Sequence, residues 1–320
     1  MSKVMRHRLF NVGKAVIGLS VSAGFLWLST RGIEWKFVAE NLKDVSISFL
    51  SMSIIIFMFA SYLRAVRWWI LFKCSGVSIT RLFIIQNEGI GVNNLMPVRV
   101  VGEVVQVGIL TKRDGVKASV ALATLGMERV IDMIASSIML TGSFFLVSEL
   151  NQFTPYVLVA IGFVFGLVVL VKLIAWSGDV AAIVRRIAFL AAFTSSLEDI
   201  MRERFRLFAS LVISLIYWIL VGIVSWIVAE GLGISVSPIV ATFAMVSTIF
   251  FATWIPSAPS AVGTFEFAVV YILEFFGIDR VSGFSYAVIV HIVFFLPPTV
   301  IAALFLPREG VFSFRFGLRR

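Results

Sequence analysis

Long apolar segments separated by short charged ones constrain this fold more than any other feature of the sequence. A helix needs roughly 20 apolar residues to cross a hydrocarbon core of about 30 Å. Hydrophobic residues make up 60% of the chain and charged residues only 14%, with a mean hydropathy of +1.02, which excludes an ordinary soluble globular protein. We expect an all-α polytopic membrane protein with about six transmembrane helices, near residues 12–30, 46–72, 118–148, 154–174, 207–230 and 282–306.

Two further apolar stretches are too long for one helix and contain proline and glycine in their middle. Residues 82–111 lie between Arg81 and a basic cluster that begins at Lys112, so both ends favour the cytoplasmic side. Residues 239–276 lie between the charge-poor segment "EGLGISVSP" and the short "GIDR", and these flanks favour the outer side for both ends. We expect two re-entrant broken helices that enter from opposite faces of the membrane. Two complete short spans in each stretch would give the same sidedness and stay an alternative.

The distribution of basic residues predicts the orientation. If the broken stretches return to the side they leave, most of the 27 Lys and Arg residues lie inside. This bias predicts cytoplasmic N- and C-termini in a cell membrane. The net charge of +9 does not indicate nucleic acid binding, because the basic residues form no compact domain. The exceptions to the inside location are Arg31, Lys36, Lys43 and Arg280 outside, and Arg99 and Arg129 at membrane depth.

The order of segments indicates an inverted-topology repeat within a single integral membrane domain, residues 1–320. The first half, about residues 12–148, and the second, about residues 154–306, each contain three crossings and one broken stretch. An odd number of crossings inverts the second half relative to the first. Similar residue types mark both breaks: Pro97, Gly102 and Glu103 in the first, and Pro256, Pro259, Gly263 and Glu266 in the second.

Ionisable residues near the bilayer midplane form the first candidate site. Glu128 and Asp132 are four residues apart and therefore share a helix face. Each charge costs on the order of 2.5 to 3.5 kcal/mol at this depth unless it is paired or hydrated. We therefore expect a network that joins the two acidic residues to Arg99, Glu103 and Arg129. The alternative is that these groups only fix helix packing.

The polar stretch 93–106 should face a cavity or protein, because lipid cannot hydrogen-bond irregular backbone. Arg99 near the break could bind a phosphate or carboxylate bidentately, so we expect it to contact an anionic lipid headgroup. Asn93 and Asn94 could donate to the same ligand or cap the broken helix. Glu266 and His291 are the corresponding candidates in the second half, and His291 is either a hydrogen-bonded packing residue or a proton relay.

The chain offers a poor case for catalysis. It has no His, Cys and Asp cluster at metal spacing, no nucleophile elbow and no phosphate-binding glycine loop, so we expect no cofactor and no metal. The single cysteine, Cys74, excludes an intrachain disulfide framework. Arg64, Arg67 and Trp68 are expected at the cytoplasmic interface, as anchors or as anionic-lipid contacts. Residues 179–208 are typical of a basic amphipathic helix on the inner leaflet.

Four motifs together resemble the membrane region of lysylphosphatidylglycerol synthases and of related flippase-like membrane proteins. They are "LRAVRWWILF", "NNLMPVRVVGE", "ERVID" and "PSAVGTFE". The family usually shows Pro-x-Arg-x-Gly-Glu, whereas Val100 and Val101 here separate Arg99 from Gly102 by two residues, which shifts Glu103 around the helix. The resemblance implies a protein that moves or presents lipid-linked molecules. The synthases also carry a cytosolic aminoacyltransferase domain, for which we expect no room in this chain.

Three functions fit these patterns. The first is a lipid flippase for an anionic, aminoacylated or glycosylated headgroup. The second is an enzyme, the membrane part of a phosphatidylglycerol lysyltransferase. The third is a non-transporting lipid-binding partner of a cell-envelope glycosyltransferase. The expected partners are a phospholipid or lipid-linked substrate and the membrane, with a second copy of the chain or an envelope-biosynthesis protein as further candidates, and no nucleic acid.

Overall fold

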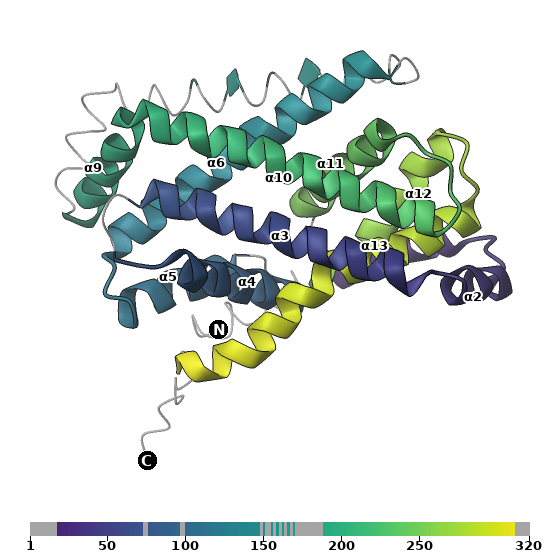
Figure 1. The fold of residues 1–320 in the computed structure, drawn as a ribbon, viewed down its shortest axis with the longest axis horizontal. Coiled ribbons are helices and arrows are strands. Elements are labelled where there is room, and N and C mark those ends of the chain that lie inside the picture. The colour runs from purple at the N-terminus through teal and green to yellow at the C-terminus, as the bar shows by residue number, and fades with distance from the viewer. Residues whose placement is uncertain are drawn as a thin grey trace, which may run out of the picture. The chain divides into compact units, whose positions relative to one another are not determined.

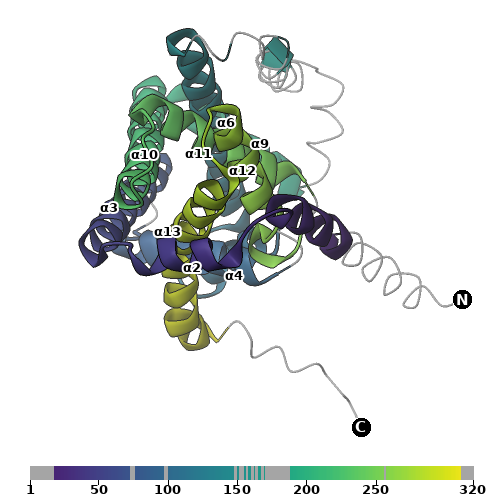
Figure 2. The same cartoon turned by 90° about the vertical axis from the view of Figure 1, so that its right-hand side faces the viewer.

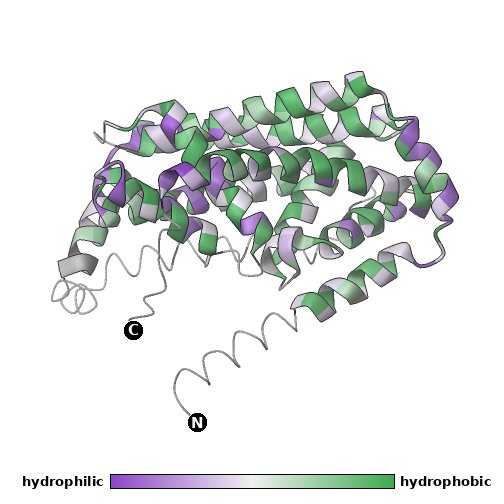
Figure 3. Cartoon of the chain, turned by 90° about the horizontal axis from the view of Figure 1, so that it is seen from below, coloured by the Kyte–Doolittle hydropathy of each residue, from purple (hydrophilic) through white to green (hydrophobic). Residues whose placement is uncertain are grey.

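The computed structural model describes residues 18–72, 76–96, 100–147, 188–255 and 257–310, with isolated residues between 150 and 169. The described residues form helices and no strands (Figure 1). Four helices are long and apolar enough to cross a membrane: α3 (Ile47–Leu71), α6 (Ala118–Leu146), α10 (Arg204–Gly231), and α13 (Arg280–Phe305) with the short η3 (Leu306–Glu309) that continues it. Figure 3 shows hydrophobic residues along much of the helical ribbon and hydrophilic residues gathered near several helix ends.

These four helices agree with four of the six predicted crossings within a few residues. Residues 18–30, the described part of the predicted first crossing, are also helical. The predicted crossing at residues 154–174 lies almost wholly outside the described residues. The described residues therefore confirm the all-α class and supply four candidate spans, and the total of six stays a prediction.

Both predicted broken stretches consist of two helices with a break between them. In the first, α4 (Ile79–Leu95) precedes α5 (Val101–Lys112). In the second, α11 (Pro238–Trp254) and α12 (Thr264–Phe275) are separated by a segment with a single 3-10 turn, η2 (Pro259–Ala261). Each break falls at the proline-containing segment that the sequence indicated. Whether the two stretches are re-entrant stays a prediction.

Two shorter helices complete the description. α2 (Trp35–Lys43) follows residues 18–30 and was not among the predicted helices. α9 (Ala188–Arg202) lies inside the segment 179–208 that was predicted to form an amphipathic helix. Its apolar residues recur at helical spacing, which lets one face pack inward while the polar face stays exposed.

The chain divides into two compact units. Unit 1 comprises residues 1–58, 87–102 and 220–303, and unit 2 comprises residues 59–86, 103–219 and 304–320. Each unit takes segments from both halves of the chain, so the units are a different division from the two predicted repeat halves. The single domain and the inverted repeat stay predictions.

Unit 1 is held together by small-residue contacts and a hydrophobic cluster. Figures 1 and 2 show α11 beside α12, which contact each other directly. Gly91 of α4 lies so close to the backbone at Pro298 and Thr299 of α13 that a side chain would not fit. Such small residues let helices approach closely in a membrane. A hydrophobic cluster joins α2 to α12 and α13: Ile33, Val38, Val270 and Phe284.

Unit 2 contains a core formed where α9 packs along α6. Its buried members come from three helices: Leu71 of α3, Ala123, Met127 and Ile131 of α6, and Ile200 of α9. Phe193, Leu197 and Met201 extend this core along the apolar face of α9. The packing fixes α9 against the first half of α6 and the end of α3.

Candidate functional site

Four charged residues of unit 2 form the first candidate site, which we call the four-charge cluster: Arg64 and Arg67 of α3, and Glu128 and Asp132 of α6. Arg64 Nε lies 3.1 Å from Glu128 Oε1, and its Nη2 lies 3.3 Å from Asp132 Oδ2. Arg67 Nη2 lies 2.5 Å from Glu128 Oε1, and Arg67 also pairs with Asp132. Because two positive and two negative charges meet here, the cluster is neutral as a whole.

The helical spacing explains why these four side chains meet. Arg64 and Arg67 are three residues apart, and Glu128 and Asp132 are four apart, so each pair lies on one face of its helix. The Arg67 side chain is fully buried and also hydrogen-bonds Ser214 of α10. The Arg64 guanidinium lies 5.7 Å from the ring centroid of Tyr217, which is also on α10. The cluster therefore ties α3, α6 and α10 together within unit 2.

The arginines that neutralise Glu128 and Asp132 differ from the predicted ones. The sequence assigned this role to Arg99 and Arg129, but Arg129 pairs with Glu103 and its side chain is 49% exposed. Arg99 lies outside the described residues. Arg64 and Arg67 were predicted at the cytoplasmic interface because they follow an apolar run in the sequence. A long arginine side chain, however, can extend its guanidinium well away from its own backbone position.

Arg67 and Trp68, which were predicted at the cytoplasmic interface, both contact protein in this structure. Both are fully buried. Trp68 Nε1 donates a hydrogen bond of 3.3 Å to Thr124 Oγ1 of α6. The signal available in the sequence was the match between the paired arginines of one crossing and the paired acids of another. The lipid role predicted for Arg64, Arg67 and Trp68 stays untested.

A second ionic group in unit 2 involves Arg81, at the start of α4. Its guanidinium contacts Asp114 at 3.0 Å and Glu309 at 2.5 Å. The hydrogen bonds that Arg81 donates to Glu309 raise the pKa of Arg81 above its usual value, so this residue keeps its charge. Arg113 Nε donates to the Glu309 backbone oxygen at 3.0 Å. These contacts fix the end of α13 and η3 against the α5–α6 connection.

The second candidate site lies in unit 1, at the break between α11 and α12. Ser260 and Ala261 both have a φ of +58°, and Gly263 has a φ of +86°. The Glu266 carboxylate accepts a 2.6 Å hydrogen bond from the Gly263 backbone N–H, which satisfies a free amide at the start of α12. A side chain at Gly263 would collide with the Ser22 carbonyl oxygen. The chain therefore requires glycine here.

Glu266 also binds His291 of α13. The distance from Glu266 Oε1 to His291 Nδ1 is 2.6 Å. The His291 ring contacts two aromatic rings, with centroid distances of 4.8 Å to Phe265 and 4.1 Å to Phe295, and these two rings also contact each other. Both predicted candidates of the second half therefore meet in one buried pair. The geometry agrees with a hydrogen-bonded packing residue, and a proton-relay role stays a prediction.

The two broken stretches meet in unit 1. Ser260 Oγ, in the second break, donates a 2.8 Å hydrogen bond to the backbone oxygen of Asn94, near the end of α4. The Asn94 amide donates to Phe295 O at 3.1 Å and to Thr299 Oγ1 at 3.0 Å in α13. Asn93 Oδ1 accepts a 2.7 Å hydrogen bond from Gly102 N in the first turn of α5. The capping role predicted for one of the two asparagines is thus confirmed for Asn93.

Together these features define the chain as an α-helical, multi-pass membrane protein with paired charges inside and two broken helical stretches. The chain belongs to the family described as the lysylphosphatidylglycerol synthase TM region, which matches residues 15–302. This match confirms the family suggested by the four sequence motifs. Neither the curated proteins nor the solved structures gave a match to the chain.

No group of His, Cys, Asp and Glu residues in the described part of the chain could hold a metal ion. The family itself is associated with lipid chemistry, and the match covers both candidate sites. The chain is therefore a membrane protein related to lipid handling.

Proposed function

We propose that the protein is a flippase-like transporter that moves a lipid with an anionic, aminoacylated or glycosylated headgroup across the membrane. The observation that carries this proposal is the hydrogen bond from Ser260 to Asn94, which joins the two broken stretches in unit 1. Transporters with broken helices bind their substrates where such breaks meet, because the free backbone groups there can coordinate polar ligands. Family membership supports a lipid as the substrate.

The chemistry of the breaks suits a headgroup with an anionic group. The first turns of α5 and α12 begin at the breaks, and helix N-termini attract phosphate through free N–H groups and the helix dipole. Arg99 belongs to the segment that connects α4 to α5, and we propose that its guanidinium binds the headgroup anion. Glu266 and His291 then supply a polar wall that could hold a hydroxyl or amino group.

The proposal includes no catalysis and no cofactor. In this view a cytosolic aminoacyltransferase activity belongs to the synthases of the family and not to this chain. Synthesis of an aminoacylated lipid by the purified protein from charged transfer RNA would overturn this part of the proposal. The proposal further places the protein in the cell membrane with both termini in the cytoplasm, on the distribution of Lys and Arg residues.

A second candidate function is a lipid-binding partner of a cell-envelope glycosyltransferase that does not transport. The four-charge cluster favours it, because each acid is neutralised within the protein and Arg67 is fully buried. Here the buried charges would only organise the fold. The two functions differ in what the substitution Arg99→Ala should change, since the second predicts no change in lipid movement.

Transport can be tested with purified protein in liposomes that contain a fluorescent lipid in both leaflets. A membrane-impermeant reductant quenches only the outer leaflet, so added quenching over time measures lipid movement. We expect faster quenching than in empty liposomes for at least one of phosphatidylglycerol, lysylphosphatidylglycerol and a lipid-linked sugar. Arg99→Ala and Glu266→Gln should slow it, while Lys43→Gln on α2 should not. No movement of any of these lipids would overturn the proposal.

A further inference from the structure

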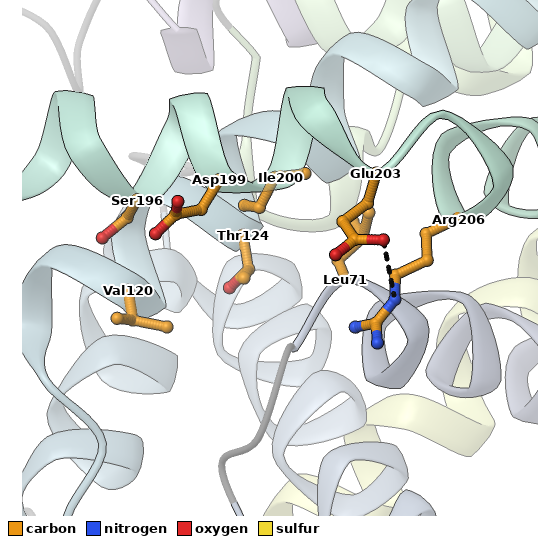
Figure 4. A pocket seen from close by; sticks show the side chains of 8 residues that line it. All are labelled: Leu71, Val120, Thr124, Ser196, Asp199, Ile200, Glu203 and Arg206. Atoms are coloured by element: carbon orange, nitrogen blue, oxygen red, sulfur yellow. Dashed lines mark ion pairs between the residues drawn. The ribbon is translucent and has the colours of Figure 1, made fainter.

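A hollow in unit 2 lies outside both candidate sites. It has a volume of about 80 Å³, space for roughly five water molecules at ~15 Å³ each. Figure 4 shows its lining, with Ser196, Asp199 and Ile200 of α9 facing Val120 and Thr124 of α6. The remaining lining residues are Leu71, Glu203 and Arg206. A space of this size admits a headgroup fragment and not an entire lipid.

The hollow lies where the ends of three candidate spans converge. Leu71 is the last residue of α3, Thr124 lies in the second turn of α6, and Arg206 lies in the first turn of α10. The ends of membrane-crossing helices lie at the level of the lipid headgroups. α9 covers the hollow from the side, with its apolar face packed on the core of unit 2. A ligand at this depth is therefore within reach of the headgroups of the surrounding leaflet.

The hollow presents charges of both signs. The Asp199 carboxylate makes no hydrogen bond or ion pair with any residue that the structure describes, and the residue is exposed. Arg206 Nε is 4.0 Å from Glu203 Oε2, and the two side chains are 38% and 39% exposed. Such a long, exposed contact contributes little, so the guanidinium of Arg206 can still bind an anion. Asp199 lies on the far side of Ile200 from Arg206 and gives the hollow a separate negative group (Figure 4).

We propose that this hollow binds a headgroup that carries both a phosphate and a primary ammonium, as in an aminophospholipid. Arg206 binds the phosphate through a charge-assisted hydrogen bond. Asp199 accepts hydrogen bonds from the ammonium, and the Ser196 hydroxyl oxygen can accept another. The apolar side chains Leu71, Val120 and Ile200 contact the methylene carbons between the phosphate and the ammonium.

The same chemistry separates this ligand from other phospholipids. Phosphatidylglycerol has no ammonium for Asp199, and the quaternary ammonium of phosphatidylcholine has no N–H to donate. A primary ammonium offers three donors, like the lysine side chain. The inference rests on the hollow and its membrane depth and not on transport, so binding and lipid movement can succeed or fail separately.

Native mass spectrometry of the detergent-purified chain tests the inference through titration with phosphatidylethanolamine, phosphatidylglycerol and phosphatidylcholine of equal chain length. We expect phosphatidylethanolamine to bind roughly tenfold more tightly than phosphatidylcholine, which corresponds to a difference of about 1.4 kcal/mol in binding free energy. Asp199→Asn should abolish most of this preference. Arg206→Gln should weaken phosphatidylethanolamine and phosphatidylglycerol alike. Equal binding of all three lipids to the unmodified protein would overturn the inference.

Two matched controls carry the same charge changes on α9 without lining the hollow. Glu198→Gln and Arg202→Gln replace exposed residues of that helix and should leave the lipid preference unchanged. If Glu198→Gln lowered the preference as much as Asp199→Asn, the effect would be general charge attraction and the inference would fail. A titration with glycerophosphoethanolamine identifies the source of the ligand. Binding of this soluble compound as tight as that of the lipid would overturn a lipid occupant.

Discussion

At the scale of single residues, Arg67 shows how membrane-buried charge is tolerated in this protein. Its side chain is fully buried, and it contacts Glu128, Asp132 and Ser214. Isolated buried charges are expensive, but two arginines and two carboxylates that neutralise each other avoid most of that cost. The buried pairs therefore hold α3 against α6 only as long as all four members are present.

Replacement of Arg67 should destabilise the protein strongly. In Arg67→Met, Glu128 and Asp132 share the single charge of Arg64, and the uncompensated buried charge should lower the free energy of unfolding by about 3–5 kcal/mol. Unfolding in mixed detergent micelles measures this change. Arg280→Gln is the control, because the Arg280–Glu274 pair is 43% exposed on both sides and should contribute only about 0–1 kcal/mol. Equal losses in both variants would contradict the proposed role of the cluster.

Gly263 is the residue at which backbone and packing limit the sequence most. Gly263→Ala should destabilise the protein more than Gly277→Ala, by about 1–3 kcal/mol. Both glycines have a positive φ, of +86° and +80°, but only Gly263 has a neighbour, the Ser22 carbonyl oxygen, in the place of an added side chain. The difference in midpoint temperature between the variants isolates this contact. Similar midpoints would mean that the break adapts to a methyl group.

At the scale of elements, the long helices were predictable and their partners were not. The α3 and α6 bounds lie within two residues of the predicted 46–72 and 118–148, because continuous apolar runs of sufficient length define a span. α2 was not predicted because its nine residues, Trp35–Lys43, are far fewer than the roughly 20 apolar residues that mark a membrane-crossing helix. The pairing of Arg67 with Asp132 requires knowledge of which helices are neighbours, which spacing along one helix does not give.

The positions of the two breaks were likewise predictable from the sequence, whereas their contacts were not. Pro and Gly located both of them, and the asparagine cap at Gly102 was among the predicted alternatives. The contact between Ser260 and Asn94 was not predictable, since the residues are 166 positions apart in sequence. Irregular backbone can form many hydrogen bonds, and only the packing of α4, α12 and α13 decides which of them form. Arg99 lies outside the described residues, so its predicted contact with a headgroup is a matter for experiment.

The first turn of α13 should make stability depend on pH. Asp279 Oδ1 accepts a 3.0 Å hydrogen bond from Ser282 N. Burial alone would raise the pKa of Asp279, but the hydrogen bonds from Ser282 hold it below its usual value. A lowered folded-state pKa gives stability above the unfolded value, near ~3.9, and this stability is lost as the pH falls through the folded value.

The substitution Asp279→Asn removes the charge and keeps a capping side chain. The unmodified protein should therefore have the higher midpoint temperature at pH 7, and the difference should shrink as the pH falls below about 3.9 toward the folded-state pKa. Thermal unfolding of both proteins in detergent between pH 3 and pH 7 measures it. A difference that stays constant over this range would show that the carboxylate charge contributes nothing at this turn.

At the scale of the whole molecule, family membership and topology carry different amounts of information. The family match over residues 15–302 establishes the kind of protein. The positive-inside bias and the two broken stretches predict how the chain crosses the membrane, which helix bounds alone do not fix. α4 and α5 together could be one interrupted span or a stretch that returns to its starting side. The inverted repeat requires the second arrangement, because it needs three crossings in each half.

Cysteine accessibility on both sides of α3 and of the first broken stretch separates these arrangements. In a Cys74→Ser background, single cysteines at Glu34, Thr80 and Lys117 occupy positions that are exposed in the structure. A membrane-impermeant maleimide added to intact cells should label Glu34→Cys alone. Thr80→Cys and Lys117→Cys should be labelled only after the membrane is opened, because α3 crosses once and the stretch from α4 to α5 returns. If Lys117→Cys were labelled in intact cells while Thr80→Cys was protected, α4 and α5 would form a single interrupted crossing, and the inverted repeat would lose its basis.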